Sequence, residues 1–274
     1  MSPRMLRPVF ALLVLLLPVA ASAAQASVPD PTDEALSGKA RLAALIERIK
    51  HEQGRMETMT ARFTQRRESD LLLEPEESEG VFYYRAPDQV RWEYLTPNPI
   101  SVVIDGKLMT TWYRDLKRAD RLKIGRYSSQ VFKYLGASGS VETLLDYFQV
   151  VADFPDGPGE PYRLRLLPKY DRISAKLESM TLWIDPELYF PSRLRYVSAD
   201  GDVTEYRFRE LTVNGQVPGD QFSLDLPKDV QVREVDLFAL LGADQGDRLG
   251  QDVEHPQAEQ VHLDDAEVGA VVLV

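Results

Sequence analysis

Hydrophobic and polar residues follow two different periods along the chain. Within residues 37–53 the apolar side chains lie three or four positions apart, which predicts an amphipathic helix with one buried stripe. The residues of this stripe are Leu42, Leu45, Ile46 and Ile49. Within residues 58–232 the period changes to two, in short segments rich in Val, Tyr, Phe, Trp and Thr. This second pattern predicts a mainly β body.

Turn-forming dipeptides divide the β body into strands. They are Asp105-Gly106, Asp200-Gly201 and Asn214-Gly215. Such pairs favour tight turns between antiparallel strands, because Gly and Asn adopt positive φ readily, and we expect a hairpin at each. Residues 127–135 and 141–148 are expected to form short helices that interrupt the strands and cover a barrel mouth or a sheet face.

The two faces of the predicted strands differ in polarity. Val90, Trp92 and Tyr94 share one face of their strand, and two charged residues share the other face. The same alternation places Tyr206 and Phe208 together on a later strand. An ordinary packed core accounts for any one such stripe, whereas several aromatic stripes around one curved sheet favour a cavity.

The N-terminus has the three parts of a secretory signal peptide. Two arginines precede an apolar run at residues 9–19, and small residues with A-x-A spacing follow. We predict a signal peptide over residues 1–26, cleaved after Ala23 or Ala26. A membrane anchor is the alternative, but the run is shorter than the roughly 20 apolar residues that span a bilayer. The mature chain is therefore expected in the bacterial periplasm, without a membrane anchor.

Cysteine is absent from the sequence. Its absence excludes disulfides, thiolate metal sites, cysteine nucleophiles and the cysteine that bacterial lipoproteins acylate. Small eukaryotic secreted domains usually depend on disulfides, whereas a periplasmic domain of about 200 residues buries enough core without them. The composition therefore agrees with a periplasmic location.

The formal net charge of −11 is distributed unevenly. Residues 236–274 carry nine acidic residues against a single base, which is typical of a disordered acidic tail. We therefore divide the rest of the mature chain into a linker over residues 27–36 and one domain over residues 37–235. The domain has no basic stripe, so neither nucleic acid nor anionic lipid headgroups are expected as partners.

Residues suited to catalysis or metal binding are scarce in the β body. The histidines lie outside it, at His51 and in the tail at His255 and His262, so a Ser–His–Asp site or a histidine-rich metal site in the sheet is not expected. The tail histidines lie among carboxylates that could bind a divalent ion weakly, but a solvated tail is the simpler interpretation. We predict no metal, no cofactor and no enzymatic activity.

Several segments occur in the order and spacing of a known family. They are Ala61-Arg62-Phe63-Thr64-Gln65, GVFYYRAPDQVRWEYLTP at residues 80–97, Asp105-Gly106-Lys107 before Trp112-Tyr113, and FSLDLPKDV at residues 222–230. Together with the signal peptide and the first helix, they resemble the periplasmic outer-membrane lipoprotein carrier family, the LolA-like proteins. The likeness covers roughly residues 40–232.

The resemblance implies both a fold and a function. The fold is mainly β, an incomplete antiparallel β-barrel of about eleven strands with an N-terminal helix and short lid helices over an apolar concavity. The function is that of a soluble, monomeric periplasmic carrier that binds the acyl chains of lipoproteins, or of a related lipid-like cargo. Its partners are an inner-membrane ABC transporter and an outer-membrane receptor.

Strand alternation within this fold selects the candidate ligand-binding residues. The expected lining of the concavity is Val90, Trp92, Tyr94, Met109, Trp112, Leu182, Ile184, Tyr196, Tyr206 and Phe208. The expected lid contacts are Phe132, Leu135, Leu144 and Leu145. In the family an arginine immediately before the proline links the sheet to the lid, but here Ala86 precedes Pro87. Arg85 is the candidate lid latch if a bulge restores its direction, and a solvent-facing arginine otherwise.

A sensor or regulatory module on the same scaffold is the alternative function. It would bind lipoproteins or a membrane-protein partner as a signal. Such regulators join the half-barrel to a second folded domain, and residues 236–274 are too short and too acidic to form one. A hydrolase would need a nucleophile and a base that the sequence does not offer. The carrier is therefore the favoured interpretation.

Overall fold

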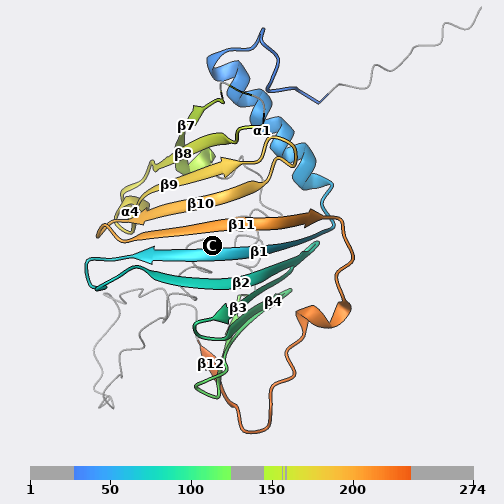
Figure 1. Ribbon diagram of the computed structural model, residues 1–274, viewed down its shortest axis with the longest axis vertical. Coiled ribbons are helices and arrows are strands. Elements are labelled where there is room, and N and C mark those ends of the chain that lie inside the picture. Colours follow the sequence, from blue (N-terminus) through green and yellow to red (C-terminus); the bar gives the residue numbers. More distant parts are fainter. Residues whose placement is uncertain (1–27, 125–144, 156, 158, 236–274) are drawn as a thin grey trace, which may run out of the picture.

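One curved sheet of twelve strands forms the body of the molecule (Figure 1). The computed structural model describes residues 28–124, 145–155, 157 and 159–235. In sheet order the strands are β12 (Gln231–Val235), β6 (Arg118–Lys123), β5 (Leu108–Tyr113), β4 (Ile100–Asp105), β3 (Gln89–Thr96), β2 (Glu76–Arg85), β1 (Thr58–Glu68), β11 (Val203–Val213), β10 (Pro191–Ser198), β9 (Leu177–Ile184), β8 (Tyr162–Pro168) and β7 (Phe148–Asp153). The sheet is open, because β12 and β7 form its two edges.

Neighbouring strands pair antiparallel everywhere except at one edge, where β12 runs parallel to β6. The predicted incomplete antiparallel barrel is therefore confirmed, with twelve strands in place of about eleven. Parallel pairing requires a long connection instead of a hairpin. Between β6 and β12 the chain forms β7 to β11, and the segment after β11 brings β12 to the edge strand β6. The sequence pattern of β12 alone did not predict this partner.

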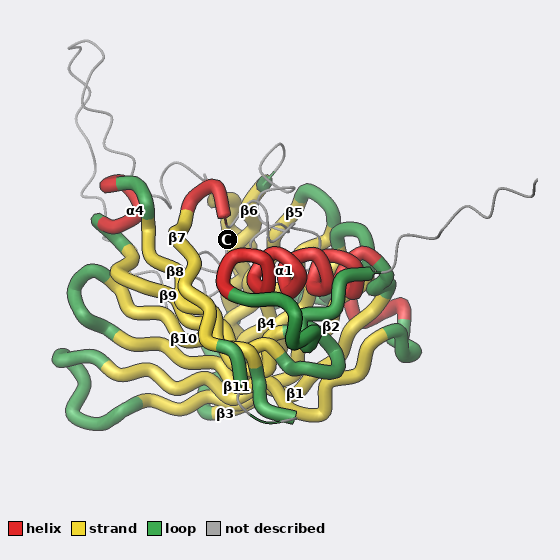
Figure 2. Tube along the Cα trace, turned by 90° about the horizontal axis from the view of Figure 1, so that it is seen from above, coloured by secondary structure: helices red, strands yellow, loops and turns green. Residues whose placement is uncertain are grey.

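The helix α1 (Gly38–Gly54) lies across the strands of the sheet (Figure 2). It begins after Ser37, whose backbone is extended as an N-cap requires. Its buried residues are Ala44, Leu45, Ile46 and Ile49. Leu45 and Ile49 belong to the same buried cluster as the inward side chains of the sheet. The predicted helix is confirmed, with its bounds shifted by one residue.

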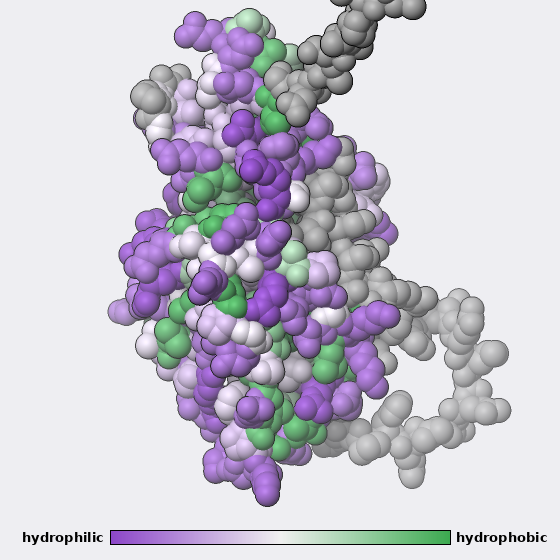
Figure 3. Space-filling model, turned by 90° about the vertical axis from the view of Figure 1, so that its right-hand side faces the viewer, coloured by the Kyte–Doolittle hydropathy of each residue, from purple (hydrophilic) through white to green (hydrophobic). Residues whose placement is uncertain are grey.

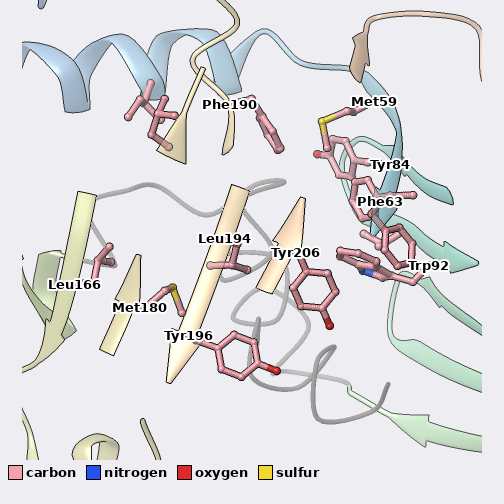
Figure 4. Packing of buried hydrophobic residues seen from close by; sticks show 14 of the residues in the cluster. Met59, Phe63, Tyr84, Trp92, Leu166, Met180, Phe190, Leu194, Tyr196 and Tyr206 are labelled. Atoms are coloured by element: carbon pink, nitrogen blue, oxygen red, sulfur yellow. The ribbon is translucent and has the colours of Figure 1, made fainter. Parts of the chain in front are cut away.

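Inward side chains from both halves of the sheet form one apolar cluster. Figure 4 shows Leu166, Met180 and Leu194 of β8, β9 and β10 facing Phe63 and Trp92 of β1 and β3 across the inside of the curve. Because successive residues of a strand point to opposite faces, one residue in two is available for this cluster. The curvature of the sheet brings the two sets together.

Two of the three predicted hairpins are confirmed. Gly106 joins β4 to β5 and Gly201 joins β10 to β11, and both glycines have positive φ. This conformation is the one for which a residue without Cβ is preferred at a tight turn. A further connection, between β8 and β9, contains the short helix α4 (Asp171–Ser174).

Asn214 ends β11 and turns the chain away from the sheet. Its φ is 56°, and its side-chain Oδ1 accepts a hydrogen bond of 2.7 Å from the backbone N–H of Glu57. Its Nδ2 donates to the carbonyl of Arg55 at 3.1 Å. The hairpin predicted at Asn214-Gly215 is therefore wrong. The asparagine instead fixes the connection between α1 and β1, and no strand follows it directly.

The segment after Asn214 crosses the outer face of the sheet. It contains the short helix η2 (Gly219–Phe222), which packs against β3 and β4 and buries Phe222. Arg91, an outward residue of β3, donates a hydrogen bond of 2.9 Å to the carbonyl of Gln221. Figure 3 views the molecule from the side on which η2 lies in Figure 1, and its described surface is mainly hydrophilic with small hydrophobic patches.

Several predicted segments fall outside the described residues. They include the signal peptide, within residues 1–27, the first predicted short helix, within residues 125–144, and the acidic tail, residues 236–274. The second predicted short helix is partly described, since residues 145–147 are helical. Its predicted end is wrong by one residue, because Phe148 already begins β7.

Candidate functional site

Aromatic side chains gather on the inner face of four neighbouring strands, β3, β2, β1 and β11. They form an aromatic cluster, which consists of Phe63, Phe82, Trp92, Tyr94, Tyr206 and Phe208. The register of the strands explains the cluster. Phe63 lies directly opposite Phe208, and Phe82 lies directly opposite Trp92. Residues opposite each other on one face of a sheet are close enough to contact.

Gly80 allows the rings of the cluster to approach one another. The ring centroid of Phe63 lies 5.0 Å from that of Trp92 and 5.0 Å from that of Tyr94. In register, Gly80 stands between Phe63 on β1 and Tyr94 on β3. A Cβ at Gly80 would lie 2.4 Å from Cζ of Phe63 and 2.2 Å from the carbonyl oxygen of Glu93. The ring of Phe63 can cross β2 only because residue 80 has no side chain.

The concave face carries a few neutral hydrogen-bonding groups. The hydroxyl oxygens of Tyr94 and Tyr206 lie 3.4 Å apart, and both side chains are buried. Burial raises the pKa of both phenols above the ordinary value of 10, because the ionised form would lose its hydration. Nε1 of Trp92 and Oγ1 of Thr111 are also buried, and neither has a hydrogen-bond partner within the part of the chain that the structure describes. The four polar groups next to the aromatic cluster are therefore neutral.

The other half of the sheet contributes mainly aliphatic side chains. The members of the buried cluster from β8, β9 and β10 are Tyr162, Leu164, Leu166, Leu177, Met180, Ile184, Leu194 and Tyr196. Leu164, Leu182 and Leu194 lie opposite one another across these three strands. This row of branched side chains faces the aromatic cluster across the curve. Together they form the surface suited to an apolar ligand.

Nine of the ten residues predicted to line the concavity occupy inward positions. Those in the buried cluster are Val90, Trp92, Tyr94, Met109, Ile184, Tyr196 and Tyr206, and those that pack against it are Leu182 and Phe208. The prediction for Trp112 is wrong. Met109 points inward, and residues three apart on one strand point to opposite faces. Trp112 lies on the outer face, where the guanidinium of Arg114 stands 4.6 Å from its ring centroid. Ligand contact by the nine inward residues stays a prediction.

The sequence did not identify several residues of the same surface. They are Phe63, Phe82, Val102, Ile104, Leu164, Leu166, Met180 and Leu194. In the strand that contains Phe82, both faces carry bulky residues, so alternation alone left its direction open. Its pairing with Trp92 resolves the direction, and pairing is information that a single sequence does not contain.

Most of the predicted lid lies outside the described residues. This applies to Phe132, Leu135 and Leu144. Leu145 is described and half-buried, and its carbonyl accepts a hydrogen bond of 2.6 Å from Nζ of Lys169, the residue after β8. This bond fastens the start of the β7 segment to the neighbouring strand. The lid contacts stay a prediction.

Arg85 ends β2 with its side chain on the outer face. Its guanidinium donates hydrogen bonds to the carbonyls of Val217 at 2.6 Å and Pro218 at 3.2 Å, and stands 4.8 Å from the ring centroid of Phe222. The register of β2 with β1 and β3 is continuous beside Arg85, so the bulge that a lid latch requires is not present there. Ala86 takes the inward direction. Within the described residues, Arg85 therefore fastens the outer segment.

A cavity of about 380 Å³ opens at one end of the curved sheet. It lies where β1 ends, β2 begins, and the β3–β4 and β5–β6 turns meet. Its wall includes Gln65, Arg67, Glu76 and Arg114, and also Tyr94 of the aromatic cluster. A polar opening therefore adjoins the apolar face.

Metal sites and membrane-spanning helices are not found in the described part of the chain. No three His, Asp or Glu side chains among these residues are placed to hold a metal ion. No helix of these residues is long and apolar enough to cross a membrane. His51 lies in the last turn of α1, and the two tail histidines lie beyond the described ranges.

A family model described as outer membrane lipoprotein carrier protein LolA matches residues 54–225. This stretch includes all strands from β1 to β11. The chain belongs to the LolA family. Its twelfth, parallel strand lies beyond the part that the LolA model matches.

Relatives within the LolA family are similar over most of their length. An outer-membrane lipoprotein carrier protein of Pseudomonas fluorescens (strain Pf0-1) is 27% identical over 225 residues, which cover 81% of this chain and 98% of that protein. One of Halorhodospira halophila (strain DSM 244 / SL1) is 28% identical over 187 residues, or 66% of this chain and 81% of that protein. Among solved structures, an uncharacterized conserved protein of Thermus thermophilus has a TM-score of 0.47 at 13% identity and covers 71% of this chain and 99% of its own. The family assignment rests on the sequence matches.

Proposed function

We propose that the chain is a soluble periplasmic carrier that holds the acyl chains of lipoproteins, or of a related lipid-like cargo, against the concave face of its sheet. The observation that carries the proposal is the aromatic cluster on the inner face of an open sheet in a LolA-family chain. Relatives at 25–27% identity are named outer-membrane lipoprotein carrier proteins. The proposal transfers their named role to this chain.

The physical task of such a carrier is to keep hydrocarbon away from water. Burial of one CH₂ group is worth about 0.8 kcal/mol, so an acyl chain of about sixteen carbons costs on the order of 12 kcal/mol to expose. Passage between two membranes is therefore too slow without a shield. An apolar face with neutral phenols, such as that around Tyr94 and Tyr206, meets this need without a catalytic group.

The direction of transport requires a donor and an acceptor. We propose an inner-membrane ABC transporter as the donor and an outer-membrane receptor as the acceptor, in line with the family resemblance. The predicted signal peptide and the absence of cysteine support a chain that is exported and not lipid-anchored. The described residues offer no observation that favours a sensor over a carrier.

The positions of the three tryptophans provide a direct test of the binding face. Trp92 lies on the concave face. Trp112 and Trp183 lie on the outer face, where Arg114 and Arg193 cover their rings at 4.6 and 4.0 Å. Bromine atoms on an acyl chain quench tryptophan fluorescence only at close range. A brominated acyl chain should therefore quench Trp92 and spare the other two.

Two matched variants separate the tryptophans. The W112F/W183F variant retains Trp92, and the W92F/W183F variant retains Trp112. Titration with a brominated diacyl lipid should quench the first variant strongly and the second hardly at all. Equal quenching of both, or quenching of Trp112 alone, would remove the acyl chain from the concave face.

Release of a lipoprotein from membranes tests the carrier role itself. Inner-membrane vesicles that contain a tagged lipoprotein and an active exporter are incubated with the chain, and the tag is measured in the soluble fraction. Phe208→Asp places a charge on a half-buried position of the concave face and should lower release. Trp112→Ser on the outer face serves as the control. If the unaltered chain releases no lipoprotein but still binds brominated lipid, the cargo is a different lipid.

A further inference from the structure

The loop between β1 and β2, residues 69–75, carries the most exposed apolar side chains of the described residues. Leu71 and Leu73 are 94% and 104% exposed relative to a free reference residue, and Leu72 between them is half-buried. Scattered single apolar residues are normal on a protein surface, whereas two fully exposed leucines in a row of three are not. We call this loop the leucine tip.

The leucine tip has a defined turn. The backbone N–H of Leu72 donates to the carbonyl of Ser69 at 3.0 Å, and the N–H of Leu71 donates to Oγ of Ser69 at 3.3 Å. These local hydrogen bonds turn the chain so that Leu71 and Leu73 point away from the sheet. The local turn thus presents both leucines to solvent.

The leucine tip also projects beyond its neighbours. Glu79 of β2 pairs with Thr96, the last residue of β3, so the first three residues of β2 extend past that strand. Figure 1 shows the β1–β2 connection reaching out at the left end of the sheet. The same two strands supply Gln65, Arg67 and Glu76 to the wall of the cavity. A partner bound at the tip would therefore face the cavity opening.

The charges beside the tip indicate the chemistry of its partner. Residues 66–79 contain six carboxylates and two arginines. Arg66 pairs with Glu68 and Glu77, and Arg67 lies 4.0 Å from Glu76. Asp70 and Glu74, which flank the leucines directly, are exposed and form no ion pair with any described residue. A bacterial membrane surface with anionic lipids repels such a cluster, whereas a basic protein surface attracts it.

We propose that the leucine tip is a docking element that inserts Leu71 and Leu73 into an apolar groove bordered by lysine or arginine side chains on a partner protein. This interaction goes beyond cargo binding and does not depend on what the concave face holds. The leucines supply apolar burial, and Asp70 and Glu74 select a basic border.

A synthetic probe of this chemistry tests the proposal with the full chain. The probe is a fluorescent amphipathic helical peptide with leucine on one face and lysine at its borders, measured by fluorescence anisotropy. Binding to the unaltered chain should weaken at least tenfold in L71S/L73S. In D70N/E74Q the salt dependence of binding should decrease, because fewer opposite charges remain at the contact.

Matched controls distinguish specific peptide binding at the leucine tip from nonspecific binding elsewhere on the surface. Glu187 and Leu188 form a similar pair elsewhere, since both are exposed, with Leu188 at 40%. E187Q and L188S should leave peptide binding unchanged, and a peptide with glutamate in place of lysine should not bind. Thermal unfolding of L71S/L73S should match that of the unaltered chain, because the side chains of Leu71 and Leu73 are fully exposed.

Three outcomes would overturn the proposal. The first is that the unaltered chain does not bind the lysine peptide, or that L71S/L73S binds it with unchanged affinity. The second is flotation with protein-free phosphatidylethanolamine and phosphatidylglycerol vesicles that is lost in L71S/L73S, which would make the tip a lipid-inserting loop. The third is a concentration-dependent dimer that the same variant abolishes, which would make a second copy the occupant.

Discussion

The guanidinium of Arg233 on β12 donates two hydrogen bonds, of 2.8 and 2.9 Å, to the carboxylate of Asp120 on β6. The two residues stand directly opposite each other in the parallel pair, and Asp120 is only 6% exposed. Nε of Arg118 lies 3.3 Å from the same carboxylate. Since no hairpin holds β12 in place, this charge-assisted pair and the backbone ladder together attach the last strand.

Arg233→Gln should lower the free energy of unfolding by about 1–3 kcal/mol, because a buried carboxylate loses its bidentate partner. The lower part of that range is expected, since Arg118 remains near and Arg233 is partly exposed. Urea unfolding measures the change, and a double-mutant cycle with Asp120→Asn isolates the pair. Asp229→Asn, which removes an exposed ion pair with Lys117 in the same region, is the control and should leave the midpoint unchanged. A cycle energy near zero would contradict the assignment.

Arg85→Met tests whether Arg85 fastens the outer segment or a lid. The methionine retains an apolar stem over Phe222 but cannot donate to Val217 and Pro218. Amide hydrogen exchange over residues 215–222 should become faster, and the free energy of unfolding should fall by about 1–2 kcal/mol. Quenching of Trp92 by brominated lipid should stay the same.

Arg62→Met provides the matched control for this experiment, because Arg62 is an exposed outward arginine of β1. It should change neither exchange nor stability. A different result for Arg85→Met, with unchanged exchange at residues 215–222 but weaker lipid binding, would restore the lid-latch role that the family resemblance implies.

Local alternation was sufficient to predict the faces of β3 and β11. Each of these strands has one apolar side, which the alternation of apolar and polar residues along the strand reveals. The residues on that side are buried on the concave face, namely Val90, Trp92, Tyr94 and Tyr206. The error at Trp112 arose because the same alternation was not applied there. Its aromatic character suggested the concave face, but its parity relative to inward residues of β5 requires the outer one.

Contacts between distant segments could not be predicted in this way. The Asn214-Gly215 pair predicts a hairpin turn. The side chain of Asn214 instead forms hydrogen bonds with the backbone of Glu57 and Arg55, more than 150 positions away. The parallel pairing of β12 and the hydrogen bonds from Arg85 to Val217 and Pro218 likewise depend on where the chain returns after β11. These features arise from tertiary hydrogen bonds, for which a single sequence carries no periodic signal.

Gly80→Ala should destabilise the aromatic cluster severely. The added Cβ would lie 2.2 Å from the carbonyl oxygen of Glu93, a backbone atom that cannot rotate away, and 2.4 Å from the Phe63 ring. We expect a loss of about 2–4 kcal/mol in the free energy of unfolding, with a change in near-ultraviolet circular dichroism. Gly54→Ala at the end of α1, where a Cβ meets no atom within 4 Å, is the control and should be neutral. Equal stability of the two variants would disprove the close packing at Gly80.

Buried phenols make the fold sensitive to alkaline pH. Burial raises the pKa of Tyr84 and of Tyr162 to about 12, and it also raises the pKa of Tyr94 and Tyr206 above 10. An unfolded tyrosine ionises near 10. Above that pH the unfolded chain loses phenolic protons that the folded chain retains, so the free energy of unfolding is at its full value below pH 10 and falls as pH rises toward the folded pKa values.

Tyr206→Phe should make this alkaline loss of stability less steep, because it removes one phenol whose pKa burial raises. Each such phenol contributes a slope of up to about 1.4 kcal/mol per pH unit between its unfolded and folded pKa values. Urea unfolding from roughly pH 9 to 11, with tyrosinate absorbance as a second observable, measures the slope. Tyr170→Phe, at a side chain that is 49% exposed, should leave the slope as it is. An identical slope in Tyr206→Phe would mean that the Tyr94–Tyr206 pair is hydrated in solution.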